Sequence, residues 1–79
     1  MDRETIRARE EQMIHTAQRF TLRQARALAG LSQKEIADRV GVRQQTYLHW
    51  EQGRTYPNVK QARLLAIELG IDLAQIIFE

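Results

Sequence analysis

The chain has 79 residues, no cysteine and a formal net charge of +2. Its length predicts one small domain, which buries only about 60% of the surface that the unfolded chain exposes. The lack of cysteine excludes disulfide bonds and thiolate metal sites, and no apolar stretch approaches the roughly 20 residues of a membrane-spanning helix. The first residues also lack the apolar region of a signal peptide, so we expect a cytoplasmic protein.

Residues 1–20 predict an N-terminal extension in front of a main domain at residues 21–79. Ile6, Met13 and Phe20 recur at spacings typical of one helical face, which Glu10 interrupts. Three interpretations remain open: an additional helix on the domain, a helix that pairs with a second subunit, or a frayed tail. An isolated helix of this length needs packing to persist.

The main domain begins with a predicted helix. Thr21-Leu22-Arg23-Gln24 has the form of a capping box, in which the first side chain accepts from the third helical N–H and the last reaches back. The helix should end near Gly30. We expect its inward face to carry four apolar residues: Leu22, Ala25, Leu28 and Ala29.

Two further helices follow in close succession. The capping box Ser32-Gln33-Lys34-Glu35 starts the first of them, and Gly41 ends it, because glycine accepts the left-handed conformation past the last turn. The next helix runs from about Arg43 to Gln52 and ends at Gly53. Small Ala37 lets the two helices cross closely. This pattern predicts a helix-turn-helix.

The rest of the chain predicts two more helices. Asn58-Val59-Lys60-Gln61 caps a fourth helix that ends at Gly70 and turns one apolar stripe inward: Ala62, Leu65, Ala66 and Leu69. Asp72 to Gln75 starts a short fifth helix with apolar Leu73, Ile76 and Ile77. No strand pattern competes. We therefore predict an all-α fold, a compact five-helix domain around a central helix-turn-helix, with an extra N-terminal helix before it.

The segment from Ser32 to Gly53 resembles the DNA-binding unit of the phage repressor and Cro-like, or Xre-type, helix-turn-helix family. Eight positions carry the residue types of the family pattern: Gln33, Ala37, Gly41, Val42, Tyr47, Trp50, Glu51 and Gly53. The resemblance reaches from about Leu22 to Ile77. It implies a sequence-specific transcriptional regulator of double-stranded DNA, in particular a repressor that binds an inverted-repeat operator as a homodimer. It also implies a largely buried ion pair between Arg26 and Glu51.

The third helix carries the residues that we expect to read bases. Gln44 and Gln45 lie in its first turn, which enters the major groove in this motif, and a glutamine amide can pair with N6 and N7 of adenine. His49 follows on the same face. Arg43 stands where the family commonly has a Ser or Thr cap, and its guanidinium can reach a phosphate or a guanine. The alternative is that these are ordinary exposed polar side chains.

Phosphate contacts are expected from other residues, because backbone contacts set affinity while base contacts set specificity. The candidates are Gln33, Lys34, Arg54 and Asn58, with Arg23 and Tyr56 as weaker ones. Residues 21–63 hold eight basic side chains and three acidic ones, whereas the charged side chains of residues 64–79 are all acidic. Such a basic region is typical of a module that neutralises phosphates, although an ordinary charged surface is the alternative.

The same fold can also serve functions other than DNA binding. A partner-binding module of the same fold, such as an antitoxin that holds a toxin, is the main alternative. We expect no enzyme, cofactor or metal, because the chain has no nucleophile with a base, no phosphate loop and no metal-ligand cluster. Two apolar sets could form a dimer interface: Ile6, Met13 and Phe20, or the slightly favoured Ile76, Ile77 and Phe78. At least one of these residues should be exposed in a monomer.

Overall fold

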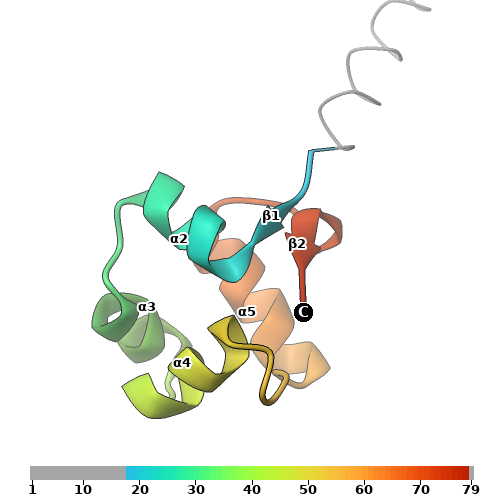
Figure 1. The fold of residues 1–79 in the computed structure, drawn as a ribbon. Coiled ribbons are helices and arrows are strands. Elements are labelled where there is room, and N and C mark those ends of the chain that lie inside the picture. Colours follow the sequence, from blue (N-terminus) through green and yellow to red (C-terminus); the bar gives the residue numbers. More distant parts are fainter. Residues whose placement is uncertain (1–17, 79) are drawn as a thin grey trace, which may run out of the picture.

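The computed structural model describes residues 18–78, so the predictions for residues 1–17, including the N-terminal helix with Ile6 and Met13, lie outside it. The described chain packs four α-helices around one core, with its first and last segments side by side (Figure 1). In chain order the elements are β1 (Phe20–Thr21), α2 (Leu22–Ala29), α3 (Gln33–Val40), α4 (Gln44–Glu51), α5 (Val59–Leu69), η1 (Leu73–Gln75) and β2 (Ile76–Ile77). No helix within residues 18–78 is long and apolar enough to cross a bilayer.

Three of the α-helices begin with the capping boxes that the sequence predicts. Thr21, Ser32 and Asn58 each accept a hydrogen bond from the backbone N–H three residues later, and the side chain there bonds back to the cap residue. In the turn between α3 and α4, Gly41 has a φ of 74°, a backbone angle that residues other than glycine rarely adopt. The chain therefore leaves α3 sharply and starts α4 three residues later.

The capping box of α3 predicts a change of stability with acidity. Hydrogen bonds from the Ser32 backbone and hydroxyl hold the pKa of Glu35 below its usual value of 4.5. The stabilisation is then fully present above the unfolded-state pKa and is lost as the pH falls through the folded-state pKa. We expect stability to fall less steeply below about pH 4.5 in Glu35→Gln than in the wild type, as measured by urea unfolding. A slope in Glu35→Gln equal to that of the wild type would contradict this prediction.

The core lies between α2, α3, α4 and α5. Its buried side chains are Leu22, Ala25, Ile36, Ala37, Val40, Tyr47, Trp50, Leu65, Ala66, Leu69 and Ile76. The close approach of α3 to α4 requires a small residue, and Ala37 is 1% exposed. The rings of Tyr47 and Trp50 meet edge to face, with centroids 6.2 Å apart. These two residues attach α4 to the core.

Two residues of α2 do not follow the predicted inward face. Leu28 is 73% exposed and Ala29 is also exposed, whereas Leu22 and Ala25 are buried. Leu28 follows Leu22 by six residues, which at 3.6 residues per turn places it about 120° away around the helix. Arg26, one residue after Ala25, instead points toward α4.

The end of the domain differs from the predicted fifth helix. Residues 73–75 form one 3₁₀ turn, and β2 then pairs in parallel with β1, with Phe20 opposite Ile76 and Thr21 opposite Ile77. The fold is thus mainly helical, with a two-residue ladder that joins both ends of the described chain (Figure 1).

The ladder also reduces the exposed apolar surface expected from the C-terminal set, because Ile76 is buried and Ile77 and Phe78 are half-buried. Ile76 is 7% exposed and belongs to the core, and Phe78 and Phe20 pack against that core. The prediction assumed a helix, on which a continuous apolar run cannot all face inward. In an extended segment alternate residues share a face, so Ile76 and Phe78 turn inward together.

Candidate nucleic-acid interface

One side of α4 is buried and the other carries exposed polar side chains. Tyr47 is fully buried and Trp50 is 4% exposed, whereas Gln44 and Gln45 are exposed and His49 is half-buried. The buried pair holds the helix firmly, so the polar residues of its first turn project from a fixed position. This arrangement suits recognition, because little order has to be gained when a ligand binds.

The N-terminus of α4 has no side-chain cap. Arg43 occupies the cap position in an extended conformation, and its side chain accepts no hydrogen bond from the helix. An arginine has only donors, so the first-turn N–H groups of α4 are left without the oxygen partner that Ser or Thr would provide. The exposed guanidinium is therefore free to reach beyond the helix end.

The two glutamines of the first turn differ in their surroundings. The amide Nε2 of Gln45 lies 3.0 Å from Nε2 of His49, so the structure brings these two predicted base-reading residues together. Among residues 18–78, Gln44 makes no side-chain hydrogen bond. Its amide keeps both donors and its acceptor available.

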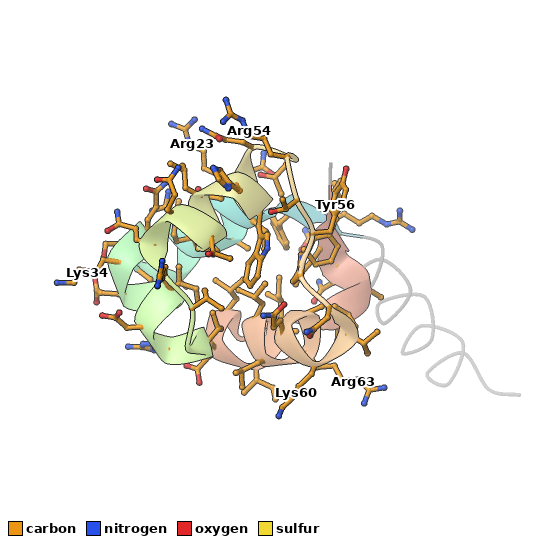
Figure 2. All side chains as sticks on the ribbon, turned by 90° about the horizontal axis from the view of Figure 1, so that it is seen from below. Arg23, Lys34, Arg54, Tyr56, Lys60 and Arg63 are labelled. Atoms are coloured by element: carbon orange, nitrogen blue, oxygen red, sulfur yellow. The ribbon has the colours of Figure 1, made fainter. Side chains whose placement is uncertain are left out.

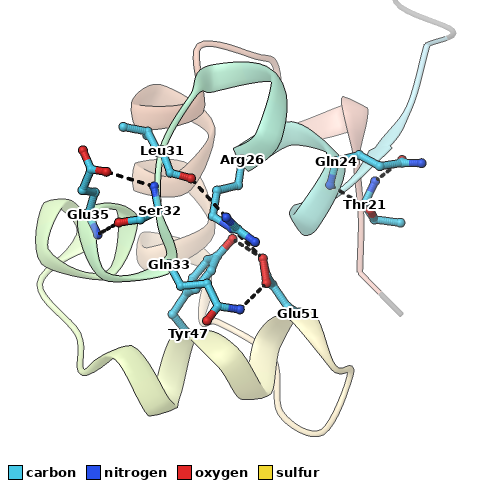
Figure 3. A network of polar contacts seen from close by, with 9 residues as sticks. All are labelled: Thr21, Gln24, Arg26, Leu31, Ser32, Gln33, Glu35, Tyr47 and Glu51. Atoms are coloured by element: carbon cyan, nitrogen blue, oxygen red, sulfur yellow. Dashed lines mark hydrogen bonds and ion pairs between the residues drawn. The ribbon is translucent and has the colours of Figure 1, made fainter.

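A polar network joins α4 to α2 and α3 from inside (Figure 3). Arg26 Nε donates to Glu51 Oε1 at 2.8 Å, and Gln33 Nε2 donates to Glu51 Oε2 at 3.1 Å. The hydroxyl of Tyr47 donates to Glu51 Oε1 at 3.3 Å, and Arg26 Nη1 also donates to the Leu31 carbonyl at 3.1 Å. The Arg26 and Glu51 side chains are 18% and 5% exposed. The network thus fixes the tilt of α4 relative to α2.

The network also perturbs two titrating groups. The hydrogen bond to Glu51 raises the pKa of Arg26, which keeps the guanidinium charged. Burial raises the pKa of the Tyr47 hydroxyl, and the negative charge of Glu51 raises it further. Tyr47 therefore remains a neutral hydrogen-bond donor. The sequence did not reveal its part in the network, nor that of Gln33.

The predicted phosphate-contacting residues occupy different environments. Gln33 is half-buried and one N–H of its amide donates to Glu51, so its second amide N–H and its backbone N–H at the start of α3 remain for a ligand. Lys34 and Arg54 are exposed, on α3 and just after α4. The Asn58 oxygen caps α5 by accepting from Gln61 N at 2.8 Å, which leaves its amide N–H groups free.

The exposed basic side chains are spread around the domain, and Lys34 lies apart from the other basic residues labelled in Figure 2. Figure 2 shows Arg23 and Arg54 on one side, with Lys60 and Arg63 on the opposite side. Beside Arg23 lies a shallow depression of about 240 Å³, lined by Arg23, Arg26, Gln33, Leu48, Glu51 and Gln52. Residues 18–78 contain no group of three or more His, Cys, Asp or Glu side chains that could hold a metal ion.

Comparison with known proteins agrees with this arrangement. A family model described as Helix-turn-helix matches residues 22–76, which include α2, α3, α4 and α5. The chain belongs to the Xre/Cro-like helix-turn-helix family. The resemblance predicted from about Leu22 to Ile77 is therefore confirmed, and the match covers residues 22–76.

One relative of this helix-turn-helix domain carries a functional description. The chain is 40% identical over 60 residues to an uncharacterized HTH-type transcriptional regulator of Methanothermobacter thermautotrophicus. The aligned region covers 76% of this chain and 87% of the relative. No solved structure matches the chain.

Proposed function

We propose that this protein is a sequence-specific transcriptional regulator of double-stranded DNA that inserts α4 into the major groove. The observation that carries the proposal is the two-sided character of α4. Its inner side is anchored by Tyr47, Trp50 and the Glu51 network, and its first turn carries the exposed side chains of Gln44 and Gln45. An α-helix fits the major groove, where each base pair offers a distinct pattern of donors and acceptors.

Base reading is assigned to Arg43, Gln44 and Gln45, and His49 lies on the same face of α4 beside Gln45. The free amide of Gln44 can donate to N7 and accept from N6 of adenine, and the Arg43 guanidinium can donate to O6 and N7 of guanine. Lys34 and Arg54 flank α4 and would neutralise phosphates on either side of the groove. The description of the Methanothermobacter relative as a transcriptional regulator supports the same function.

Selection of bound sites from a pool of random duplex DNA tests the proposal. We expect a defined sequence to be enriched, and its affinity to fall steeply between 50 and 200 mM salt, by about tenfold or more for several phosphate contacts. Recovery of random sequences would contradict the proposal. The alternative of an antitoxin-like module predicts a protein complex whose apolar interface responds little to salt.

Arg54→Ala should weaken binding to every duplex by a similar factor. The exposed guanidinium just after α4 is expected to neutralise one phosphate, so the slope of log K against log salt should flatten by about one unit. Arg63→Ala is the matched control, because Arg63 lies on the opposite side of the domain (Figure 2). A slope that is unchanged in Arg54→Ala would remove Arg54 from the DNA interface.

We further propose that the protein is a repressor that binds an inverted repeat as a homodimer. One recognition helix covers only a few base pairs, and this motif gains affinity by pairing two half-sites about one helical turn apart. Several large apolar side chains of residues 18–78 are exposed and could contribute to an interface: Leu28, Tyr56, Val59, Ile67 and Leu73.

The intact chain should therefore sediment as a dimer on its operator. The full chain is needed, because Ile76 is part of the core and a shorter chain would lose it. We expect two protein chains per operator duplex. A selected operator that contains a single half-site and binds a single protein chain would exclude the dimer. Repression would appear as reduced transcription from a promoter that overlaps the operator.

A further inference from the structure

The side chains of Gln45 and His49 form a directional hydrogen bond on α4. Their Nε2 atoms lie 3.0 Å apart, and residues four apart on an α-helix are neighbours on its surface. An amide nitrogen can only donate, so the ring Nε2 of His49 accepts the hydrogen bond. The proton of the neutral imidazole then lies on Nδ1.

This direction determines which groups of Gln45 remain for DNA. One N–H of the amide is used by His49, whereas the carbonyl oxygen and the second N–H stay free. Those two neighbouring groups match the amino group and N7 of adenine in the major groove. An amide turned over would exchange oxygen and nitrogen, so a donor would face the adenine amino group and the paired match would be lost.

We propose that His49 is a positioning residue that holds the Gln45 amide in the orientation that reads adenine. This inference rests on the proposed DNA-binding function and adds the residue that sets specificity at one base pair. His49 acts through Gln45 and needs no base contact of its own. Gln44 has no such partner within the described residues, so its amide is oriented only when it meets a base. Gln45 is the stricter reader of the two.

Two substitutions of His49 separate positioning from charge. His49→Glu supplies only an acceptor, which keeps the Gln45 amide in place, whereas His49→Lys supplies only donors, which turn the amide over. The measured quantity is the ratio of affinities for operators with adenine or guanine at the base pair whose preference Gln45→Ala relaxes.

The overall affinity and the base preference should change independently of each other. The negative charge of His49→Glu should weaken binding to all duplexes while the adenine preference stays within about twofold of the wild type. The positive charge of His49→Lys should strengthen binding while the adenine preference falls by at least about fivefold, the lower limit for loss of a paired contact. Thermal unfolding of each variant checks that the domain remains folded.

The same substitutions in a Gln45→Ala background provide the control. Without Gln45 there is no amide to orient, so neither substitution should alter the base preference. A preference that still follows the charge at position 49 would show that this residue reads the base itself, which would overturn the inference.

Failure of the inference and failure of the proposed function are distinguishable. If the wild type selects a sequence but His49→Lys keeps the adenine preference, the positioning role is wrong and DNA recognition stands. The same holds if Gln45→Ala relaxes no base pair. If the wild type selects no sequence, the proposed function and the inference are both wrong.

Discussion

Arg26→Ala should lower the free energy of unfolding by about 3 to 5 kcal/mol, because it leaves the Glu51 carboxylate buried without its cation. The Glu51 side chain is 5% exposed, and its remaining donors, from Gln33 and Tyr47, are neutral. The total free energy of unfolding of a small domain is about 5 to 15 kcal/mol, so the variant should be close to unfolding at 37 °C. Denaturant unfolding measures the change.

Arg23→Ala is the control for this prediction. Arg23 lies on the same helix but is exposed, so its removal should change stability by less than about 0.5 kcal/mol. Arg26→Met combined with Glu51→Leu should be less destabilised than Arg26→Ala alone, since apolar replacement of a whole buried pair leaves no stranded charge. A loss below about 1 kcal/mol in Arg26→Ala would mean that the pair behaves like a surface ion pair.

Gln44→Ala should weaken binding to the selected operator by about 1 to 3 kcal/mol and relax the preference at one base pair. The side chain is exposed and makes no hydrogen bond within residues 18–78, so the unfolding midpoint should not change. Binding to operators with each of the four bases at that pair gives the measurement. Gln52→Ala, at the far end of α4, should leave every base preference unaltered. An unchanged preference in Gln44→Ala would remove Gln44 from the readers.

The sequence predicts those features that depend on residues close together in the chain. Each capping box spans four residues, and the glycines that end α2, α3 and α5 take the left-handed conformation expected of them. The stripe of α5 is buried as predicted, because a helix of three turns has a clear periodicity. The polar face of α4 followed from the position of its first turn within the motif.

The features that the sequence did not predict depend on distant residues. β1 and β2 come from opposite ends of the described chain, and strands of two residues are too short to leave an alternating pattern. The hydrogen bond from Gln33 to Glu51 joins α3 to α4 and depends on how these helices cross. The contact between Gln45 and His49, in contrast, could have been predicted from the sequence, because residues four apart on a helix are neighbours.

Major-groove reading by α4 is tested most directly by replacing adenine in the selected operator with 7-deazaadenine. This base lacks the N7 acceptor in the major groove and leaves the minor groove unchanged. At the base pair assigned to Gln44, we expect wild-type binding to weaken by about fivefold or more and binding of Gln44→Ala to remain as it was. If 7-deazaadenine has no effect at any position, while loss of the guanine amino group in the minor groove weakens binding, the account is wrong.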